Sequence, residues 1–160
     1  MAADMFLMLD GIKGESSDDK HKGEIDIESF SWGLAQTGSG NRGTGSGTGK
    51  VDVHDINITK RVDKSSPTIQ LACANGKHIA KGKITLRKAG ENPLDYLTFD
   101  LEGLLISTYQ IAHTAGSDVP SETFSINFVK VKSEYWTQSD KGAKGENANF
   151  SWDVAKNVKY

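Results

Sequence analysis

The sequence lacks the features that would tie it to a membrane or to a disulfide framework. Its 160 residues contain one cysteine, Cys73, which cannot form an internal disulfide. No apolar run approaches the roughly 20 residues of a membrane-spanning helix. Residues 1–6 lack the basic region and the long apolar region of a secretory signal. We therefore expect a fold that does not depend on an oxidising compartment, and no membrane insertion. If the protein is exported, we expect a route other than a general signal peptide.

An excess of one charge is also missing. Nineteen Lys and Arg face 21 Asp and Glu, which gives a net charge of −2. No global field then favours nucleic acid or an anionic membrane surface. Hydrophobic residues at 36% and charged residues at 25% suit one folded domain spanning residues 1–160. No internal repeat of fixed period is present.

One stretch, residues 65–76, is typical of a helix. Ser66 is placed to accept a hydrogen bond from a free N–H of the first turn, and Pro67 fits the next position because its missing N–H would be unpaired there. Gly76 supplies a left-handed stop. Ile69, Ala72 and Cys73 fall on one modest apolar stripe. Such a short helix is marginal in water by itself, so we expect it to lie against a larger body.

That body is predicted to consist of about eight β-strands. Several segments alternate apolar and polar residues, and the phase slips by one within three of them, as β-bulges would cause. Such bulges bend and twist strands, which the closure of a small barrel requires. The fold class is mainly β, a barrel or a two-sheet sandwich with one helix. The strand-like segments are 5–9, 23–33, 51–60, 83–87, 97–111, 124–135 and 150–160, separated by polar loops at 13–23, 37–49, 115–121 and 138–149.

The motifs that suggest chemistry lack the context that the chemistry needs. Residues 38–43 match G-x-G-x-x-G, but more glycine and then a strand follow, where a dinucleotide site needs a helix. A P-loop fails at Thr44 and Val51. The four histidines show neither zinc-ligand spacing nor an H-E-x-x-H helix, and no nucleophile elbow supports a hydrolase triad. We expect solvated loop or strand histidines.

Two further features have simple structural interpretations. Cys73 on the helix stripe is most simply a small buried hydrophobe. The basic run between Lys77 and Lys88 has no interleaved aromatics, so it is interpreted as a solvated strand face, with a contact to an acidic protein surface as the alternative. The residues therefore predict a binding or structural protein rather than an enzyme, with no catalytic residues, no cofactor and no metal.

Several segments resemble the Hcp family, the haemolysin-coregulated tube proteins of the bacterial type VI secretion system. The resemblance covers essentially the whole chain, with the segments in order and at close spacing. It is weakest over residues 112–120. The segments are Ala3-Asp4-Met5-Phe6, Lys13-Gly14-Glu15-Ser16, Glu24-Ile25-Asp26-Ile27 leading to Trp32-Gly33, Gly49-Lys50-Val51, Asp63-Lys64-Ser65-Ser66-Pro67, Ala72-Cys73, Gly76-Lys77-His78 and Leu86-Arg87-Lys88-Ala89-Gly90.

The resemblance implies a small β-barrel of two packed antiparallel sheets with one short α-helix. Six copies would form a ring with an open centre, and stacked rings would form the tube inside a contractile sheath. A spike (VgrG-type) protein would sit at the tip, and effector proteins would ride in the channel. The protein would stay in the bacterial cytoplasm until assembly and then be expelled to the extracellular space or a target cell. A monomeric β-barrel binding module, a secreted effector without a tube role, or a weak hydrolase stays as the alternative.

Two sets of residues are predicted to serve that function. Ser31, Thr108, Gln110 and Thr114 lie opposite the apolar strand faces, so they are candidates for the channel wall and for effector contact. The competing interpretation is that these residues face outer solvent. The glycine-rich loop is the candidate ring-stacking element. Its residues are Gly38, Gly40, Arg42, Gly43, Gly45, Gly47 and Gly49.

Overall fold

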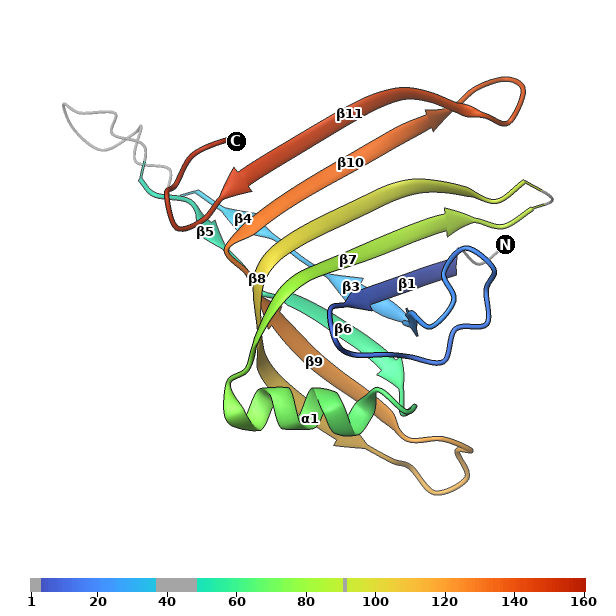
Figure 1. Cartoon of the computed structure of the whole chain (residues 1–160), viewed down its shortest axis with the longest axis vertical. Coiled ribbons are helices and arrows are strands. Elements are labelled where there is room, and N and C mark those ends of the chain that lie inside the picture. The colour runs from blue at the N-terminus through green and yellow to red at the C-terminus, as the bar shows by residue number, and fades with distance from the viewer. Residues whose placement is uncertain (1–3, 37–48, 91) are drawn as a thin grey trace.

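The protein folds as two antiparallel β-layers with one helix, as Figure 1 shows. This computed structural model describes residues 4–36, 49–90 and 92–160. The described residues form eleven strands where the sequence predicts about eight. The strands are β1 (Asp4–Leu9), β2 (Ile25–Asp26), β3 (Ser29–Ser31), β4 (Leu34–Ala35), β5 (Asp52–Val53), β6 (Ile56–Arg61), β7 (His78–Lys88), β8 (Leu94–Ala112), β9 (Ser121–Asn127), β10 (Lys130–Gln138) and β11 (Lys144–Asp153); the helix is α1 (Ser66–Asn75).

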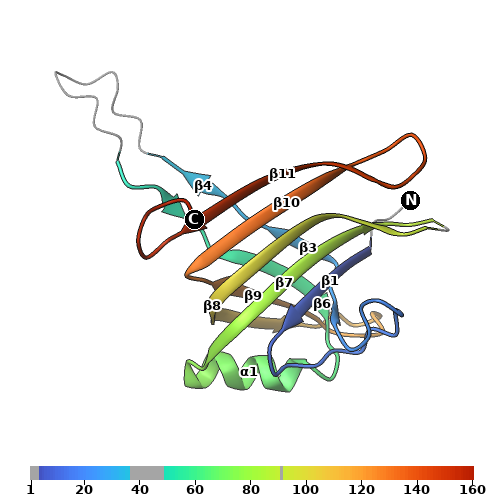
Figure 2. The same ribbon diagram turned by 45° about the horizontal axis from the view of Figure 1, so that its top comes forward.

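Strand β8 belongs to both layers because it turns a corner. Its first half pairs with β7 and β10, and its second half pairs with β9. Gly103 stands at the corner with φ 66°, a conformation that glycine adopts without steric cost. One layer is then β2-β1-β7-β8-β10-β11, and the other is β8-β9-β6-β3. Figure 2 shows β7, β8, β10 and β11 lying side by side in the first of these layers.

The two layers are joined on the far side by the chain itself. Between β2 and β3, the Ile27 N–H donates to the Met5 carbonyl at 3.2 Å, and the Glu28 N–H donates to the Thr59 carbonyl at 2.8 Å. This connection crosses from the edge of β1 to the edge of β6. The sheet path shows no strand pairing between β2 and β3 among the described residues, so the strands do not close into a complete barrel, and this connecting segment spans the gap.

The core fills the space between the layers. Leu7 and Ile84 meet Ile58, Leu104 and Phe124 there, all with less than 1% of their surface exposed. Burial of this kind stabilises the fold by roughly 25 cal/mol per Å² of apolar surface removed from water. The helix closes one end, packing on β8 with Ile69 and Ala72 buried (Figure 1).

The predicted helix is confirmed, but its start differs in detail. Pro67 lies in the first turn, and Gly76 ends the helix with φ 63° while its N–H donates to the Ala72 carbonyl. The predicted cap by Ser66 is wrong, since Ser65 precedes the helix and makes no side-chain cap bond. Ser66 instead accepts from the Asp63 N–H at 3.0 Å. Cys73 is half-buried rather than buried.

Three strand predictions are wrong because a change of phase marks a break or corner rather than a bulge. Segment 23–33 is two strands, β2 and β3, which lie in different layers. Segment 51–60 is two strands, β5 and β6, that lie in different sheets. Segment 124–135 is β9 and β10, which turn at Phe128 and Val129. The predicted loop at 138–149 contains most of β11, whereas residues 154–160 are not a strand. Residues 144–149 are exposed on both faces of that strand, so they are mostly polar and show no apolar alternation from which a strand could be predicted.

Candidate functional site

The layer β8-β9-β6-β3 has one apolar and one polar face. In β6, Ile56 and Ile58 are buried, while Asn57 between them is exposed. In β9, Phe124 and Ile126 are buried, while Thr123 and Asn127 point outward. Successive side chains of a strand point to opposite faces, so the burial of one set against the core exposes the other. The result is a polar surface four strands wide.

The strand register arranges this surface into two rows, which we call the central polar rows. Opposed residues in antiparallel strands share a face, so a row can be followed from strand to strand. None of the eight side chains is charged. The first row is Ser31, Asn57, Ser125 and Thr108, and the second is Ser29, Thr59, Thr123 and Gln110.

Hydrogen bonds join the first row across its strands. The Thr108 hydroxyl donates to the Ser125 hydroxyl at 2.7 Å, and Ser125 donates to Asn57 Oδ1 at 2.6 Å. In the second row, the hydroxyls of Thr59 and Thr123 lie 3.4 Å apart. Ser125 is 7% exposed, so the bonds at the centre of the surface are partly shielded from water. The rows are therefore an ordered surface rather than a set of independent side chains.

A bulge in β8 sets the outer end of this surface. The register with β9 shifts between Ile106 and Thr108, so Ser107 and Thr108 are both exposed. Ser107 then donates to Asp55 Oδ2 at 2.7 Å, and Asn127 Nδ2 donates to Asp55 Oδ1 at 2.9 Å. The Asp55 carboxylate thus has a donor on each oxygen.

An ion pair lies at the other end of the rows. Arg61 Nε donates to Glu28 Oε1 at 2.8 Å, with both side chains well exposed. Exposed pairs of this kind contribute little to stability, up to about 1 kcal/mol. Both side chains also line a pocket of about 360 Å³. Its lining is Glu28, Arg61, Gly116, Ser117, Asp118, Val119 and Ser121.

Three of the four predicted channel residues lie together. Ser31, Thr108 and Gln110 are exposed members of the central polar rows. Thr114 does not join them, because β8 ends at Ala112 and Thr114 lies in the following loop, where its carbonyl accepts from the Ser117 N–H at 3.0 Å. Sequence reasoning missed Ser29 on β3, and it also missed Asn57, Thr59, Thr123 and Ser125 on β6 and β9. The apolar alternation at positions 56, 58, 124 and 126 could have identified the residues on β6 and β9, since polar residues between inward ones must face outward.

The predicted stacking loop lies almost entirely outside the described residues. Gly38, Gly40, Arg42, Gly43, Gly45 and Gly47 belong to segment 37–48, and only Gly49 is described. Strands β4 and β5, which flank this segment, pair with each other in a separate two-stranded sheet.

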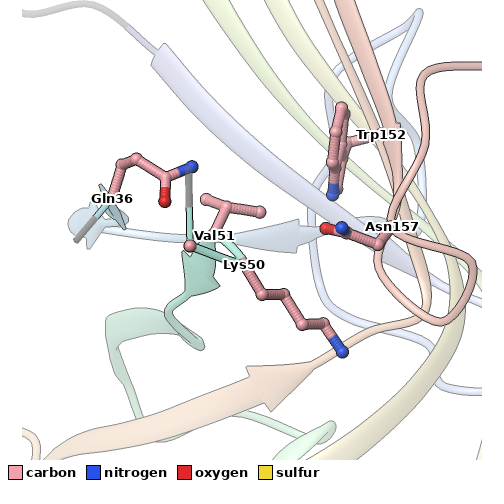
Figure 3. Close-up of a pocket in the computed structure, with 6 residues that line it drawn as sticks. Gln36, Lys50, Val51, Trp152 and Asn157 are labelled. Atoms are coloured by element: carbon pink, nitrogen blue, oxygen red, sulfur yellow. The ribbon is translucent and has the colours of Figure 1, made fainter. Parts of the chain in front are cut away.

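A small pocket of about 240 Å³ lies beside this hairpin (Figure 3). Lys50 extends away from Trp152, whose indole nitrogen lies near the Asn157 side chain in this view. The indole N–H of Trp152 has no hydrogen-bond partner among the described residues. The lining contains one titratable side chain, Lys50, so the pocket offers no acid–base pair. The lining residues are Gln36, Gly49, Lys50, Val51, Trp152 and Asn157.

A buried ionic network lies behind the polar surface, beneath α1. Lys60 pairs with Glu122 and with Asp63, and Ser66 and Tyr109 donate to Glu122. Burial alone would raise the pKa of Asp63, but hydrogen bonds from Ser65 and Lys60 outweigh it and lower the pKa. Burial, with the bond to Glu122, raises the pKa of Tyr109. The network holds the helix start on β6 and β9.

The described residues show no assembled catalytic or metal centre. No cluster of three or more His, Cys, Asp or Glu that could hold a metal occurs among them. His21 is buried between Glu24, at 2.7 Å, and Asp95, at 3.3 Å, so the prediction of a solvated histidine is wrong there. No hydroxyl or thiol side chain in the described segments bonds to an imidazole. No helix of the described part is both long and apolar enough to cross a membrane.

Comparison with known proteins finds relatives that match the chain over almost its whole length. The chain is 42% identical over 160 residues to Protein hcp1 of Pseudomonas aeruginosa, with 99% of each chain covered. Among solved structures, one described as a type six secretion system protein superposes with a TM-score of 0.93 at 29% identity, covering 99% of this chain and 100% of that one. Hcp1 from Salmonella typhimurium superposes with a TM-score of 0.84 at 35% identity, and each chain is covered completely.

The family model for the type VI secretion system effector Hcp matches residues 6–135. That range contains both central polar rows, the helix and the buried network. Together with full-length identity above 40%, it confirms the resemblance seen in the sequence. The chain belongs to the Hcp family of secreted, β-rich structural proteins of the type VI secretion system.

Proposed function

We propose that this chain is the structural subunit of a type VI secretion inner tube. Six copies form a ring whose open channel is walled by the central polar rows, and the rings stack and are expelled with effector proteins inside. The observation that carries the proposal is the surface itself: eight uncharged polar side chains, in register across four strands, on the back of the apolar core.

The contrast with the other layer favours a channel over outer solvent. On β7, β8 and β10, the face away from the core carries charges of both signs, paired as Lys83–Asp100, Lys130–Glu102 and Lys132–Glu134. Such interspersed charge is usual on surfaces exposed to bulk water. The central polar rows have none. Small neutral side chains keep a narrow channel wet and bind its contents weakly, which suits a conduit.

The glycine-rich segment suits a contact between rings. Its six glycines cannot bury apolar surface, and β4 and β5, which flank it, pair with each other in a hairpin separate from the main sheet. We infer that this segment meets the neighbouring ring in the stack. Rings of a variant with the segment shortened should assemble but not stack; normal stacking would contradict the inference.

The remaining partners follow from the same role. A contractile sheath surrounds the tube, a spike (VgrG-type) protein caps it, and effectors occupy the channel. The subunit is cytoplasmic before assembly and is then expelled from the cell. It acts without catalysis, a cofactor, nucleic acid or membrane insertion. The alternative is a monomeric β-barrel that binds a partner.

The solution mass separates the two candidates. Light scattering behind a sizing column should give six times the chain mass of 17.3 kDa, and negative-stain images of that peak should show rings. A stable monomer at high concentration would contradict the tube role. In a second step, Ser31→Arg should keep the ring mass but reduce the effector found with it, because it places a long charged side chain on the proposed wall.

A further inference from the structure

The hydrogen-bond chain of the first row runs in one direction. Asn57 Oδ1 can only accept a hydrogen bond, so the Ser125 hydroxyl must be the donor in this pair. Ser125 Oγ must then accept from Thr108, which uses the Thr108 proton. Both hydroxyl protons are therefore committed within the sheet.

This direction fixes what the row presents to its surroundings. The bond to Ser125 orients the Asn57 amide, and its Nδ2 carries two donor hydrogens with no partner among the described residues. Asn57 is exposed and central, with Ser31 opposite it on β3. At the other end of the chain, Thr108 Oγ1 has lone pairs left to accept. The row thus offers oriented donors at Asn57 and an acceptor at Thr108.

The nearest charges on this face are already engaged. Asp55 receives bonds from Ser107 and Asn127, and Arg61 is paired with Glu28. No unpaired charge lies within the two rows. A bound segment would therefore be selected by hydrogen bonding, which salt screens little compared with exposed ionic contacts.

We propose that Asn57 is the specificity-determining residue of this face and selects uncharged hydrogen-bond acceptors, such as main-chain or side-chain amide carbonyls, on the protein segment held there. Its amide is pre-oriented by the Thr108–Ser125 chain. That the segment belongs to channel cargo rests on the proposed function. Binding at Asn57 itself needs only the folded face, which a single chain contains.

The test uses the full chain in whatever assembly it forms and three labelled peptides of about twelve residues, each carrying an uncharged dye. The first contains Asn, Ser, Thr and Gly; the second and third carry Asp or Lys at alternate positions. Fluorescence anisotropy gives Kd at about 0.05 M and about 0.5 M NaCl, where screening lengths differ severalfold. A sizing column on the same sample reports assembly.

We expect the neutral peptide to bind most tightly, with Kd changing less than about twofold with salt. Asn57→Ala should weaken it about three- to tenfold, as loss of one or two neutral hydrogen bonds predicts. Gln138→Ala, which removes an exposed side-chain amide at the end of β10 and outside the central polar rows, should leave Kd unchanged. Asn57→Asp should reverse the preference, binding the Lys peptide in a salt-dependent way.

Three results would overturn the proposal: tighter, salt-sensitive binding of a charged peptide by the unmodified chain, unchanged affinity in Asn57→Ala, or no binding of any peptide. Absence of rings on the column would refute the tube role but not this inference, because neutral-peptide binding through Asn57 can be measured on a monomer. The two failures are therefore distinguishable.

Discussion

Lys60 and Glu122 face each other across β6 and β9 with no exposed surface, forming an ion pair inside the apolar face of the sheet. Lys60 Nζ also donates to Asp63 Oδ1 at 2.9 Å and to the Arg61 carbonyl at 3.0 Å. Glu122 accepts from Ser66 at 2.7 Å and from Tyr109. A buried charge costs several kcal/mol of desolvation unless it is paired and hydrogen-bonded, and both conditions hold here.

Removing one partner of this pair should destabilise the fold strongly. Glu122→Leu leaves the Lys60 ammonium without its nearest carboxylate, and we expect a loss of about 3–5 kcal/mol in the free energy of unfolding. The double variant Lys60→Met/Glu122→Leu should recover much of this loss, since no charge of the pair remains buried. Urea unfolding of the single and double variants measures the coupling.

Lys132→Ala is the matched control for that experiment. Lys132 pairs with Glu134 at 3.2 Å in a partly exposed position, so its removal should change the free energy of unfolding by no more than about 1 kcal/mol. Additive effects of the two core substitutions would contradict a direct Lys60–Glu122 interaction.

Asp18 should make the fold sensitive to acid. Two hydrogen bonds from Arg87, at 2.6 and 2.9 Å, lower the pKa of Asp18 from 3.8 to about 2. Because the pKa of Asp18 is lower in the folded than in the unfolded chain, the ionised carboxylate stabilises the fold. That stabilisation is complete above the pKa of the unfolded state and is lost as the pH falls through the pKa of the folded state. The stability that Asp18 supplies should therefore decline from about pH 4 towards pH 2.

Asp18→Asn tests the assignment. The variant should be less stable at pH 7 and should show a shallower decline in the free energy of unfolding between about pH 4 and pH 2, followed by urea titration at each pH. Asp19→Asn, on the exposed neighbour, should keep the full decline. An identical pH dependence for Asp18→Asn and the unmodified chain would show that the Arg87 contact does not shift Asp18.

The sequence predicts much of this fold because local signals agree with the final packing. Pro67 and Gly76 mark a helix that ends where expected, and the opposed phases of Phe30 and Ser31 place Ser31 outside the core. Elsewhere the sequence pattern fails to predict which strand positions face the core, because polar side chains occupy some of them. Lys60 and Glu122 sit at inward positions, which only their mutual pairing across two strands distant in sequence permits.

Corners are equally hard to predict from one sequence. A shift of phase at Phe128 looks the same whether the strand bulges or turns into the other layer. In the fold, the chain turns at Val129, which lies between β9 and β10 and beside Gly103 of β8, and the sequence does not predict that proximity. The site shows the same limit: Ser31 and Thr108 could be predicted to face outward, but their common row depends on register with Asn57 and Ser125.

Gly103 should be the least replaceable residue of that corner. Its φ of 66° is costly for other residues, and an added Cβ would lie 2.9 Å from Val129 Cγ2. Gly103→Ala should lower the free energy of unfolding by about 1–3 kcal/mol in urea titration. Val129→Ala in the same chain should restore part of the loss by removing the clash. Gly116→Ala, with φ 94° and nothing near its Cβ, isolates the backbone cost. Equal losses at positions 103 and 116 would mean that the Val129 contact is unimportant.

Thr108 and Thr114 are both channel candidates from the sequence, but the fold places them differently. Thr108 donates within the first polar row, whereas Thr114 lies beyond the end of β8. Thr108→Arg should abolish effector retention by the assembled ring, and Thr114→Arg should leave it unchanged, measured by co-purification at matched ring mass. The two variants add the same side chain at exposed sites, so a difference between them reflects position rather than charge. Equal loss for both would extend the wall into the loop after β8, and equal retention would remove β8 from the wall.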